Sequence, residues 1–233
     1  MTRKYMSVLL AAVLFAALGV PQVFSQRKEV RKVEDAIEVF QAFTRIPETS
    51  IPASMMNEAR GVAIIPGVTK AGLVIGGEYG KGLIVARNDD GSWGSPVFII
   101  LTGGSVGLQI GVQTIDLVLS FRTRRSIEKI VEKGFTLGVD ASVAAGDVGR
   151  RAAAGTDADL KAEIYSYSRS KGLFAGVSLA GARIETDDEA NSAYYGRAHI
   201  PPADILKGRG LVLPASAADL SRILALPALA ASK

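Results

Sequence analysis

The chain has 233 residues, with 27 basic side chains, 23 acidic side chains and one histidine, and its formal net charge is +4 at pH 7. Cysteine is absent, which excludes disulfides, thiolate metal sites and lipid attachment through a cysteine. The modest charge and the single tryptophan, without any nucleic-acid-binding motif in the sequence, argue against a nucleic acid partner.

Residues 1–25 have the pattern of an export signal. Arg3 and Lys4 form a basic start, the apolar run Ser7–Val20 follows, and we expect cleavage before Gln26. The apolar run is short for a membrane span, and an uncleaved anchor is the alternative. This pattern predicts a periplasmic or secreted protein, and the rest of the chain is long enough for one domain.

Apolar residues at helical spacing predict helices at both ends of the chain and one in the middle. In Glu29–Ile46, the side chains of Val33, Ile37 and Phe40 fall on one face, and Pro47 ends the pattern. The other predicted helices, in chain order, are Ala53–Ala59, Arg122–Lys133, a helix through Tyr194 and Tyr195 that opens with the capping box Thr186–Glu189, and Ser216–Leu226, followed by a frayed tail from Pro227.

Short apolar runs separated by glycine predict strands in the middle of the chain. They are Val62–Ile65, Leu73–Gly76, Gly82–Ala86, Val97–Leu101, Leu108–Leu119, Phe135–Ala145 and Glu163–Ile184. Asn88–Gly91 has the composition of a hairpin turn, and Gly103 with Gly104 indicates a break between strands. Because strands and helices do not alternate regularly, we predict an α+β single domain. Its sheet is bent, mainly antiparallel and glycine-rich, open or barrel-like, and flanked by N-terminal and C-terminal helices.

No catalytic pattern in the sequence is complete. Residues 103–107, GGSVG, match the G-x-S-x-G elbow of esterases, but the elbow needs a helix after the serine and the next segment is predicted as a strand. A triad would also depend on His199, with Asp140 or Asp147 between it and the serine. The residue after Lys81 is glycine where a phosphate-binding loop needs serine or threonine. We therefore expect that the protein is not an enzyme and that it binds no cofactor and no metal.

The stretch Ile164–Ile184 carries the most specific signal in the chain. It reads IYSYSRSKGLFAGVSLAGARI, and its tyrosines alternate with serines as in a half-buried strand. The segment SRSKGLFAGVSL resembles the signature of the SYLF domain, a lipid-binding module. Three further blocks resemble the same domain in the same order, namely Arg60–Gly82, Trp93–Leu119 and Phe135–Arg150.

This resemblance and the predicted elements divide the chain into four parts. They are an export signal over residues 1–25, N-terminal amphipathic helices over 26–59, a SYLF core over 60–213, and a C-terminal helix and tail over 214–233.

The resemblance implies a non-enzymatic phospholipid-binding protein, since eukaryotic SYLF proteins bind acidic phospholipids with an N-terminal amphipathic helix taking part. Candidate lipid-binding residues are the cations at the start of that helix, Arg27, Lys28, Arg31 and Lys32, and a second group, Arg122, Arg124 and Arg125. Each contributes about 1 kcal/mol near an anionic surface, and insertion of Val33 and Phe40 would add to it. Alternatively, these two apolar side chains pack on the sheet and the cations are solvated.

Because the chain has an export pattern, the expected ligand is an anionic phospholipid or another lipid of the bacterial cell envelope, such as phosphatidylglycerol, cardiolipin or lipopolysaccharide. Contact with the membrane is expected to be peripheral. Two alternatives stay open. One is a carrier whose bent sheet encloses an apolar ligand, and the other is a structural assembly protein of the envelope. Nothing in the sequence decides the oligomeric state.

Overall fold

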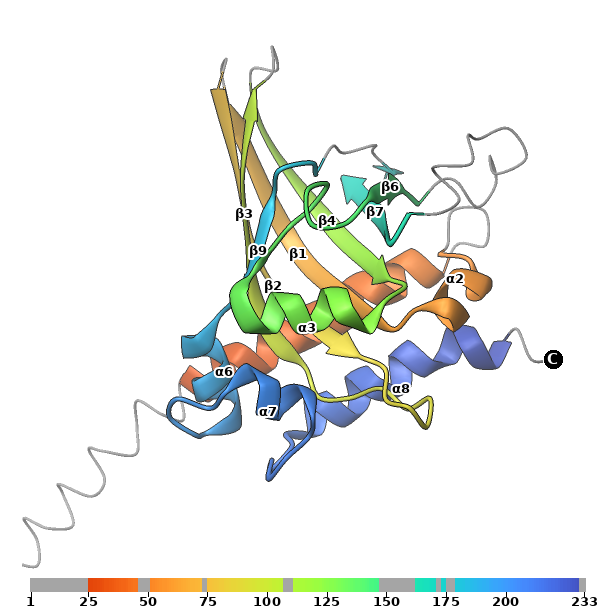
Figure 1. Cartoon of the computed structure of the whole chain (residues 1–233), viewed down its shortest axis with the longest axis vertical. Helices are drawn as coiled ribbons and strands as arrows, with labels where there is room; N and C mark the ends of the chain where they lie inside the picture. Colours follow the sequence, from red (N-terminus) through yellow and green to blue (C-terminus); the bar gives the residue numbers. More distant parts are fainter. Residues whose placement is uncertain are drawn as a thin grey trace, which may run out of the picture.

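The protein is an α+β domain built on one curled, mainly antiparallel sheet, as the sequence predicts (Figure 1). The computed structural model describes residues 25–45, 51–72, 75–106, 111–146, 162–170, 173–174 and 179–230. Within them the sheet has nine strands in the order β5-β9-β3-β2-β1-β4-β7-β6, with β8 paired to β7. The strands are β1 (Gly61–Gly72), β2 (Ile75–Ala86), β3 (Val97–Val106), β4 (Gly111–Phe121), β5 (Phe135–Thr136), β6 (Val143–Ala145), β7 (Ile164–Ser170), β8 (Leu173–Phe174) and β9 (Arg183–Thr186). Only the pairing of β6 with β7 is parallel among these described strands.

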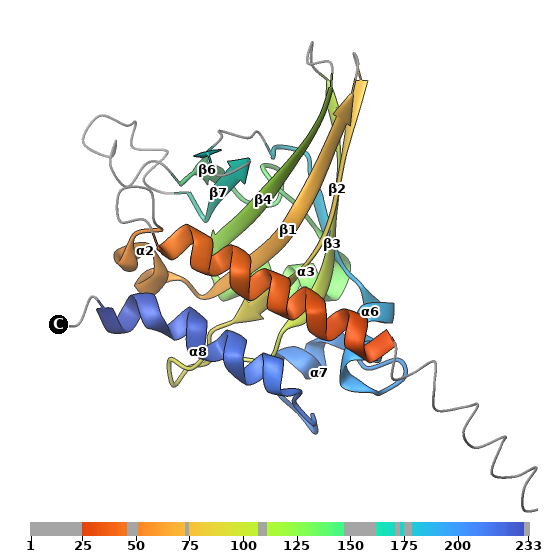
Figure 2. The same cartoon turned by 180° about the vertical axis from the view of Figure 1, so that it is seen from behind.

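The four long strands lie in the order β3-β2-β1-β4, so β1 and β2 form a central hairpin and β3 and β4 pair with its two edges. Their far ends project beyond the helices (Figures 1 and 2). The sequence predicted a separate strand over Leu73–Gly76, which is wrong, because β1 ends at Gly72, β2 begins at Ile75, and Gly72 pairs with Gly76. The predicted break at Gly103 is also wrong. Gly103 pairs with Glu78 of β2, and a Cβ at Gly103 would lie 2.5 Å from the Glu78 Oε1 atom. This glycine leaves room for a neighbouring carboxylate and does not end the strand.

Helices cover both faces of the sheet. The N-terminal helix, residues 25–44, and α8 (Ala215–Ala230) run side by side across the back of the sheet (Figure 2). On the opposite face lies α3 (Arg124–Lys133) (Figure 1). The short helices α2 (Ala53–Glu58), α6 (Asp188–Tyr195) and α7 (Pro202–Leu206) lie around the same end of the sheet.

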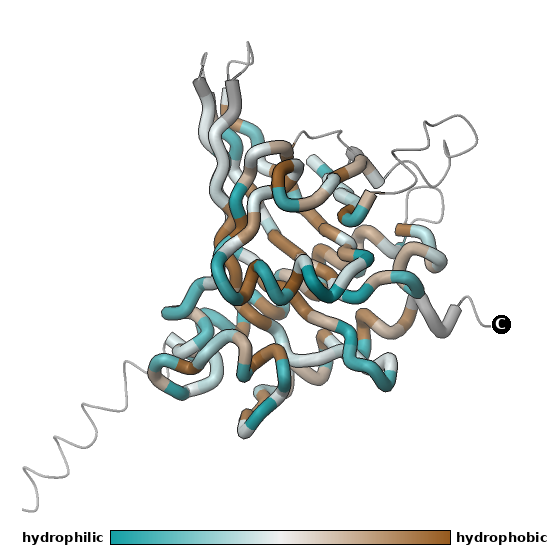
Figure 3. The backbone as a smooth tube through the Cα atoms, in the orientation of Figure 1, coloured by the Kyte–Doolittle hydropathy of each residue, from teal (hydrophilic) through white to brown (hydrophobic). Residues whose placement is uncertain are grey.

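The core lies between these layers, and Figure 3 shows hydrophobic residues concentrated along the central strands. Among the core side chains, Ile99, Leu101, Leu117, Leu137 and Ile184 all have 0% exposure.

Several predicted elements differ from the structure in their bounds. The predicted strand Phe135–Ala145 is two short strands, β5 and β6, and Glu163–Ile184 contains β7, β8 and the start of β9. The N-cap of α6 is Asp187, whose side chain accepts a hydrogen bond from the Ala190 amide, so the cap is one residue later than the predicted capping box. Helix α8 continues through Pro227 to Ala230, where the sequence predicted a frayed tail. The helix α7 was not predicted.

Candidate functional site

The apolar face of the N-terminal helix is anchored in the core. Val33, Ala36 and Phe40 have 0% exposure and Phe43 has 1%. Val33 and Phe40 therefore pack against the protein itself, which is the second of the two alternatives that the sequence left open. Insertion of these two side chains into a bilayer is not compatible with the docked helix.

The opposite face of the same helix presents cations to solvent. Arg27, Lys28 and Arg31 are exposed, and none of the three forms an ion pair with another described residue. Lys32, the fourth predicted cation, is held differently. Its Nζ atom lies 2.5 Å from the Glu29 Oε2 atom and 5.9 Å from the centre of the Phe98 ring. Lys32 thus helps to dock the helix, and the other three cations form a ridge that we call the helix ridge.

Buried polar groups fix the position of the helix ridge. Glu29 is only 4% exposed, and its partner Lys32 reaches over Phe98 of β3. At the start of the helix, the Gln26 side chain donates a hydrogen bond of 3.1 Å to the carbonyl oxygen of Tyr194 in α6. Because the helix is tied to β3 and α6 at this end, its exposed cations have a defined direction.

A second ion pair joins the sheet to α6 close to the helix ridge. The Lys81 Nζ atom of β2 lies 2.7 Å from the Asp187 Oδ2 atom. Although burial by itself raises the pKa of Asp187, the hydrogen bond from Lys81 and that from the Ala190 amide outweigh it, and the pKa is lowered from its ordinary value. The same hydrogen bond raises the pKa of Lys81.

We expect Asp187→Asn to remove the contribution of this contact to stability that is lost in acid. The pKa of Asp187 is lower in the folded state than its value of about 3.9 in an unfolded chain. Its contribution to stability is therefore complete above pH 4 and is lost as the pH falls through the folded-state pKa. Asparagine still caps a helix, so the variant should lose about 1 kcal/mol at pH 7 and show a shallower decline in acid.

Urea unfolding of both proteins at pH 7, 4 and 3 measures this difference. Glu189→Gln, an exposed change in the first turn of α6, serves as the control. An equally steep acid decline in the Asp187→Asn variant would contradict the prediction.

The second predicted group of cations lies at the start of α3. Arg122 pairs with Glu58 of α2 at 3.1 Å, and Arg124 pairs with Glu128 at 3.3 Å. Arg124 also donates a hydrogen bond of 3.2 Å to the carbonyl oxygen of Arg87. These two arginines thus connect neighbouring elements of the protein, although each keeps about a third of its side chain exposed.

Arg125, the third member of that group, is exposed and lines a shallow hollow of about 410 Å³ along α3. The hollow carries both signs of charge, since its charged lining residues are Arg125, Lys129, Lys133, Glu128, Glu132, Asp140 and Glu163. Lys129 and Asp140 pair with one another within it. This face of α3 is polar with mixed charge.

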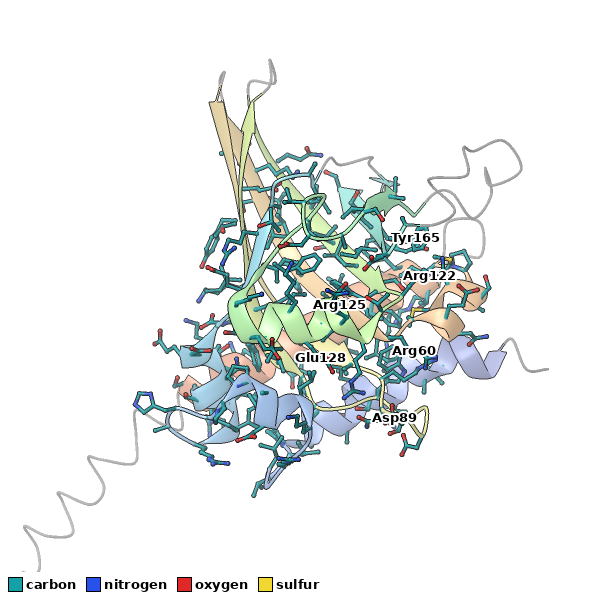
Figure 4. All side chains as sticks on the ribbon, in the orientation of Figure 1. Arg60, Asp89, Arg122, Arg125, Glu128 and Tyr165 are labelled. Atoms are coloured by element: carbon teal, nitrogen blue, oxygen red, sulfur yellow. The ribbon has the colours of Figure 1, made fainter. Side chains whose placement is uncertain are left out.

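Two further arginines at this end of the sheet were missed by the sequence reasoning. Arg60 precedes β1 and Arg87 follows β2, and the Arg87 amide donates a hydrogen bond of 2.8 Å to the Arg60 carbonyl oxygen. Figure 4 shows Arg60, Arg122 and Asp89 on the side of the molecule where α3 begins. The signal was present in the sequence, because each arginine directly flanks an apolar strand and antiparallel neighbours bring such strand ends together.

The helix ridge and the arginines near α3 are separate surfaces. The ridge lies at the α6 end of the N-terminal helix, as the bond from Gln26 to Tyr194 shows. Arg122 contacts α2, and α2 lies near the other end of that helix (Figure 2). From Arg27 to Thr44 the helix rises about 26 Å. Both groups are lipid-binding candidates on the basis of the sequence, and the fold does not bring them together.

The G-x-S-x-G match does not have the structural context of an esterase elbow. Ser105 lies within strand β3, and the next described element is strand β4 and not a helix. Asp147, considered for the same triad, lies outside the described residues. In the part of the chain that the structure describes, no three acidic or histidine side chains are grouped to hold a metal ion. Every helix among these residues is also too short or too polar to cross a membrane.

The fold and the helix ridge define a small α+β module with an exposed cationic surface and no complete catalytic group among the described residues. A family model described as Ysc84, Las17-binding protein actin regulator, matches residues 102–226. The chain belongs to this family, which is the SYLF domain family.

Relatives from yeasts and from human agree with this membership. The SH3 domain-containing protein PJ696.02 of Schizosaccharomyces pombe is 41% identical over 75% of this chain and 40% of its own length. Protein YSC84 of Saccharomyces cerevisiae is 38% identical over 86% of this chain and 43% of its own length. The human SH3 domain-containing YSC84-like protein 1 is 36% identical over 83% of this chain and 57% of its own length. The matched region thus spans between two fifths and three fifths of each relative.

The predicted localisation is wrong. The relatives are yeast and human proteins, two of the three are named for SH3 domains, and the family is described as an actin regulator. Those descriptions conflict with a periplasmic or secreted protein. They also give no support to an export signal or to a role in a bacterial envelope. The predicted signal at residues 1–25 lies outside the described residues except for its last position, which begins the N-terminal helix.

Proposed function

We propose that this chain is a non-enzymatic module that binds anionic phospholipid surfaces peripherally through the helix ridge. The observation that carries the proposal is the exposure of Arg27, Lys28 and Arg31 on a helix whose other face is anchored in the core. Cations held in a fixed direction lose little freedom when they meet a charged surface. Arg122, Arg124 and Arg125 are proposed as a weaker, second contact, because two of the three are already engaged in ion pairs.

The expected affinity of one copy is low. Each basic residue near an anionic membrane contributes about 1 kcal/mol, so the helix ridge supplies about 3 kcal/mol. A free energy of that size corresponds to a dissociation constant of several millimolar. Useful binding by this ridge therefore depends on several contacts acting together, and it should weaken steeply with salt.

Vesicle co-sedimentation tests this proposal. Full-length protein should pellet with vesicles that contain phosphatidylserine at low salt, and pelleting should fall at high salt and with neutral vesicles. Changing Arg27, Lys28 and Arg31 to Gln should reduce the bound fraction at least tenfold, since it removes about 3 kcal/mol. Changing Lys133, Arg209 and Arg222, three other exposed cations, to Gln removes the same charge elsewhere and should cause a smaller loss. Equal losses in the two triple variants would contradict a localised site.

A second candidate function is binding of an actin-regulating protein, which the family description favours. The matched residues 102–226 include α3, whose exposed face has mixed charge. Such a face complements another protein better than it complements a uniformly anionic membrane. Pull-down with Las17 tests this candidate. Arg125→Glu should weaken the capture strongly and should reduce vesicle binding much less than the triple change of Arg27, Lys28 and Arg31 does.

A further inference from the structure

A small hollow of about 190 Å³ opens beside Trp93. It is formed by the connection between β2 and β3, the end of α7, the connection between α7 and α8, and the first turns of α8. Its lining residues are Asn88, Trp93, Gly94, Ser95, Leu206, Lys207, Gly208, Leu213, Ala217, Ala218 and Ser221. At the roughly 30 Å³ that a water molecule occupies in the liquid, the hollow holds a group of about six non-hydrogen atoms.

The hollow has apolar walls, among them Trp93, Leu206 and Leu213, and polar ones, among them Asn88. Leu213 is 51% exposed, and its neighbour Val212 is 86% exposed. Only six large hydrophobic side chains are exposed in the described part of the chain, and these are two of them. An aliphatic group in the hollow would cover part of Leu213.

The charge around the hollow favours a ligand that carries an anionic group in addition to its aliphatic chain. Lys207 is the only charged residue among the described residues that line it, and Lys207 is exposed. Arg209, two residues further along the same connection, is exposed as well. Because no carboxylate lines the hollow beside the Lys207 ammonium group, this charge favours an anionic group on the ligand.

Trp93 forms one wall of the hollow and is 7% exposed. The Arg87 guanidinium lies over its ring at 4.7 Å from the ring centre. An indole ring in this wall offers an apolar surface to the chain of a ligand.

We propose that this hollow binds a short aliphatic carboxylate of about four to six carbons. The chain of the ligand lies against Trp93, Leu206 and Leu213, and its carboxylate lies at the rim near Lys207. The same chemistry is presented by the C-terminus of a polypeptide that ends in an apolar residue, and the test separates these two sources. This site is independent of the membrane function proposed above.

Trp93 is the only tryptophan of the chain, so its fluorescence reports on the hollow directly. Titration of the full chain with the straight-chain acids from ethanoate to octanoate should give a saturable change. Affinity should rise about fourfold for each added methylene and stop rising beyond hexanoate, when the hollow is filled. Pentanol and pentylammonium should bind at least tenfold more weakly than pentanoate. A flat response to every acid would overturn the proposal.

Variants test whether the change in Trp93 fluorescence arises from binding in the hollow. Ala218 is exposed and lines the hollow, so Ala218→Leu should abolish the pentanoate response without unfolding the domain. Ala215→Leu is the matched control on α8, because Ala215 is exposed and does not line the hollow. Lys207→Gln should remove the preference for pentanoate over pentanol and leave pentanol binding intact. Retained binding in Ala218→Leu, or an unchanged preference in Lys207→Gln, would contradict the assignment. Tighter binding of N-acetyl-leucine than of pentanoate would assign the site to a polypeptide C-terminus.

Discussion

Replacing Gly82 by alanine is expected to destabilise the domain by about 3 kcal/mol or more, because the added methyl group has no space. A Cβ at Gly82 would lie 2.2 Å from the carbonyl oxygen of Ile64 and 2.7 Å from the Ile65 Cα atom. Both are backbone atoms of the neighbouring strand β1, so a side-chain rotation cannot relieve the overlap. The two strands would have to separate beside the pair formed by Ile64 and Leu83, where their register shifts.

Gly104→Ala is the matched control for this prediction. Gly104 lies in β3, beside β2 in the same sheet, and a Cβ there would have no atom within 4 Å. Its alanine variant should change the free energy of unfolding by less than about 0.5 kcal/mol. Urea unfolding followed by circular dichroism measures both variants. Equal stability of the two variants would show that β1 and β2 are not packed as described.

Phe40→Ala is the second change with a large expected effect, at about 3–5 kcal/mol of lost stability. Phe40 has 0% exposure and packs in the core from the middle of the N-terminal helix. For a domain of this size that loss corresponds to a fall in Tm of roughly 10 °C. Glu38→Ala, an exposed change two residues away, should leave Tm nearly unchanged.

Phe40→Ala also distinguishes packing of Phe40 in the core from insertion of Phe40 into a membrane. Because Phe40 faces the core and not the solvent, Phe40→Ala should keep the salt-sensitive vesicle binding of the helix ridge at temperatures where the protein is still folded. If Phe40 inserted into the bilayer, its truncation would instead weaken vesicle binding and leave Tm nearly unchanged. Thermal unfolding and co-sedimentation on the same sample distinguish these two outcomes.

The sequence predicted the kind of fold because its local signals agree with one another. Helical spacing identified the N-terminal helix within a few residues at each end, and the hairpin turn at Asn88–Gly91 joins β2 and β3 as expected. The errors occur where glycine was taken as the end of a strand. At Gly103 the glycine makes space for a side chain of the next strand, and no local pattern reveals which neighbour a strand will have.

The burial of β7 also depends on neighbours that a local sequence pattern does not reveal. Alternation of tyrosine and serine predicted a half-buried β7, but Tyr165 and Tyr167 are 5% exposed, Ser166 is 9% and Ser168 is 7%. Both faces of this strand are covered, and β6 and β4 pair with its two edges. Whether the polar face of a strand meets water depends on segments distant in the sequence, so the alternation alone could not decide it.

For the candidate surfaces, the sequence by itself identified the cations and the family. Charges at the start of a helix, and blocks of residues that resemble a known domain, can both be recognised within short stretches of sequence. The tertiary structure alone decided their roles. It buried Val33 and Phe40, engaged Lys32 with Glu29, and left Arg27, Lys28 and Arg31 exposed. It also brought Trp93 beside Lys207. The physical reason is that exposure and pairing are set by which surfaces pack together, and packing joins residues that are far apart in the chain.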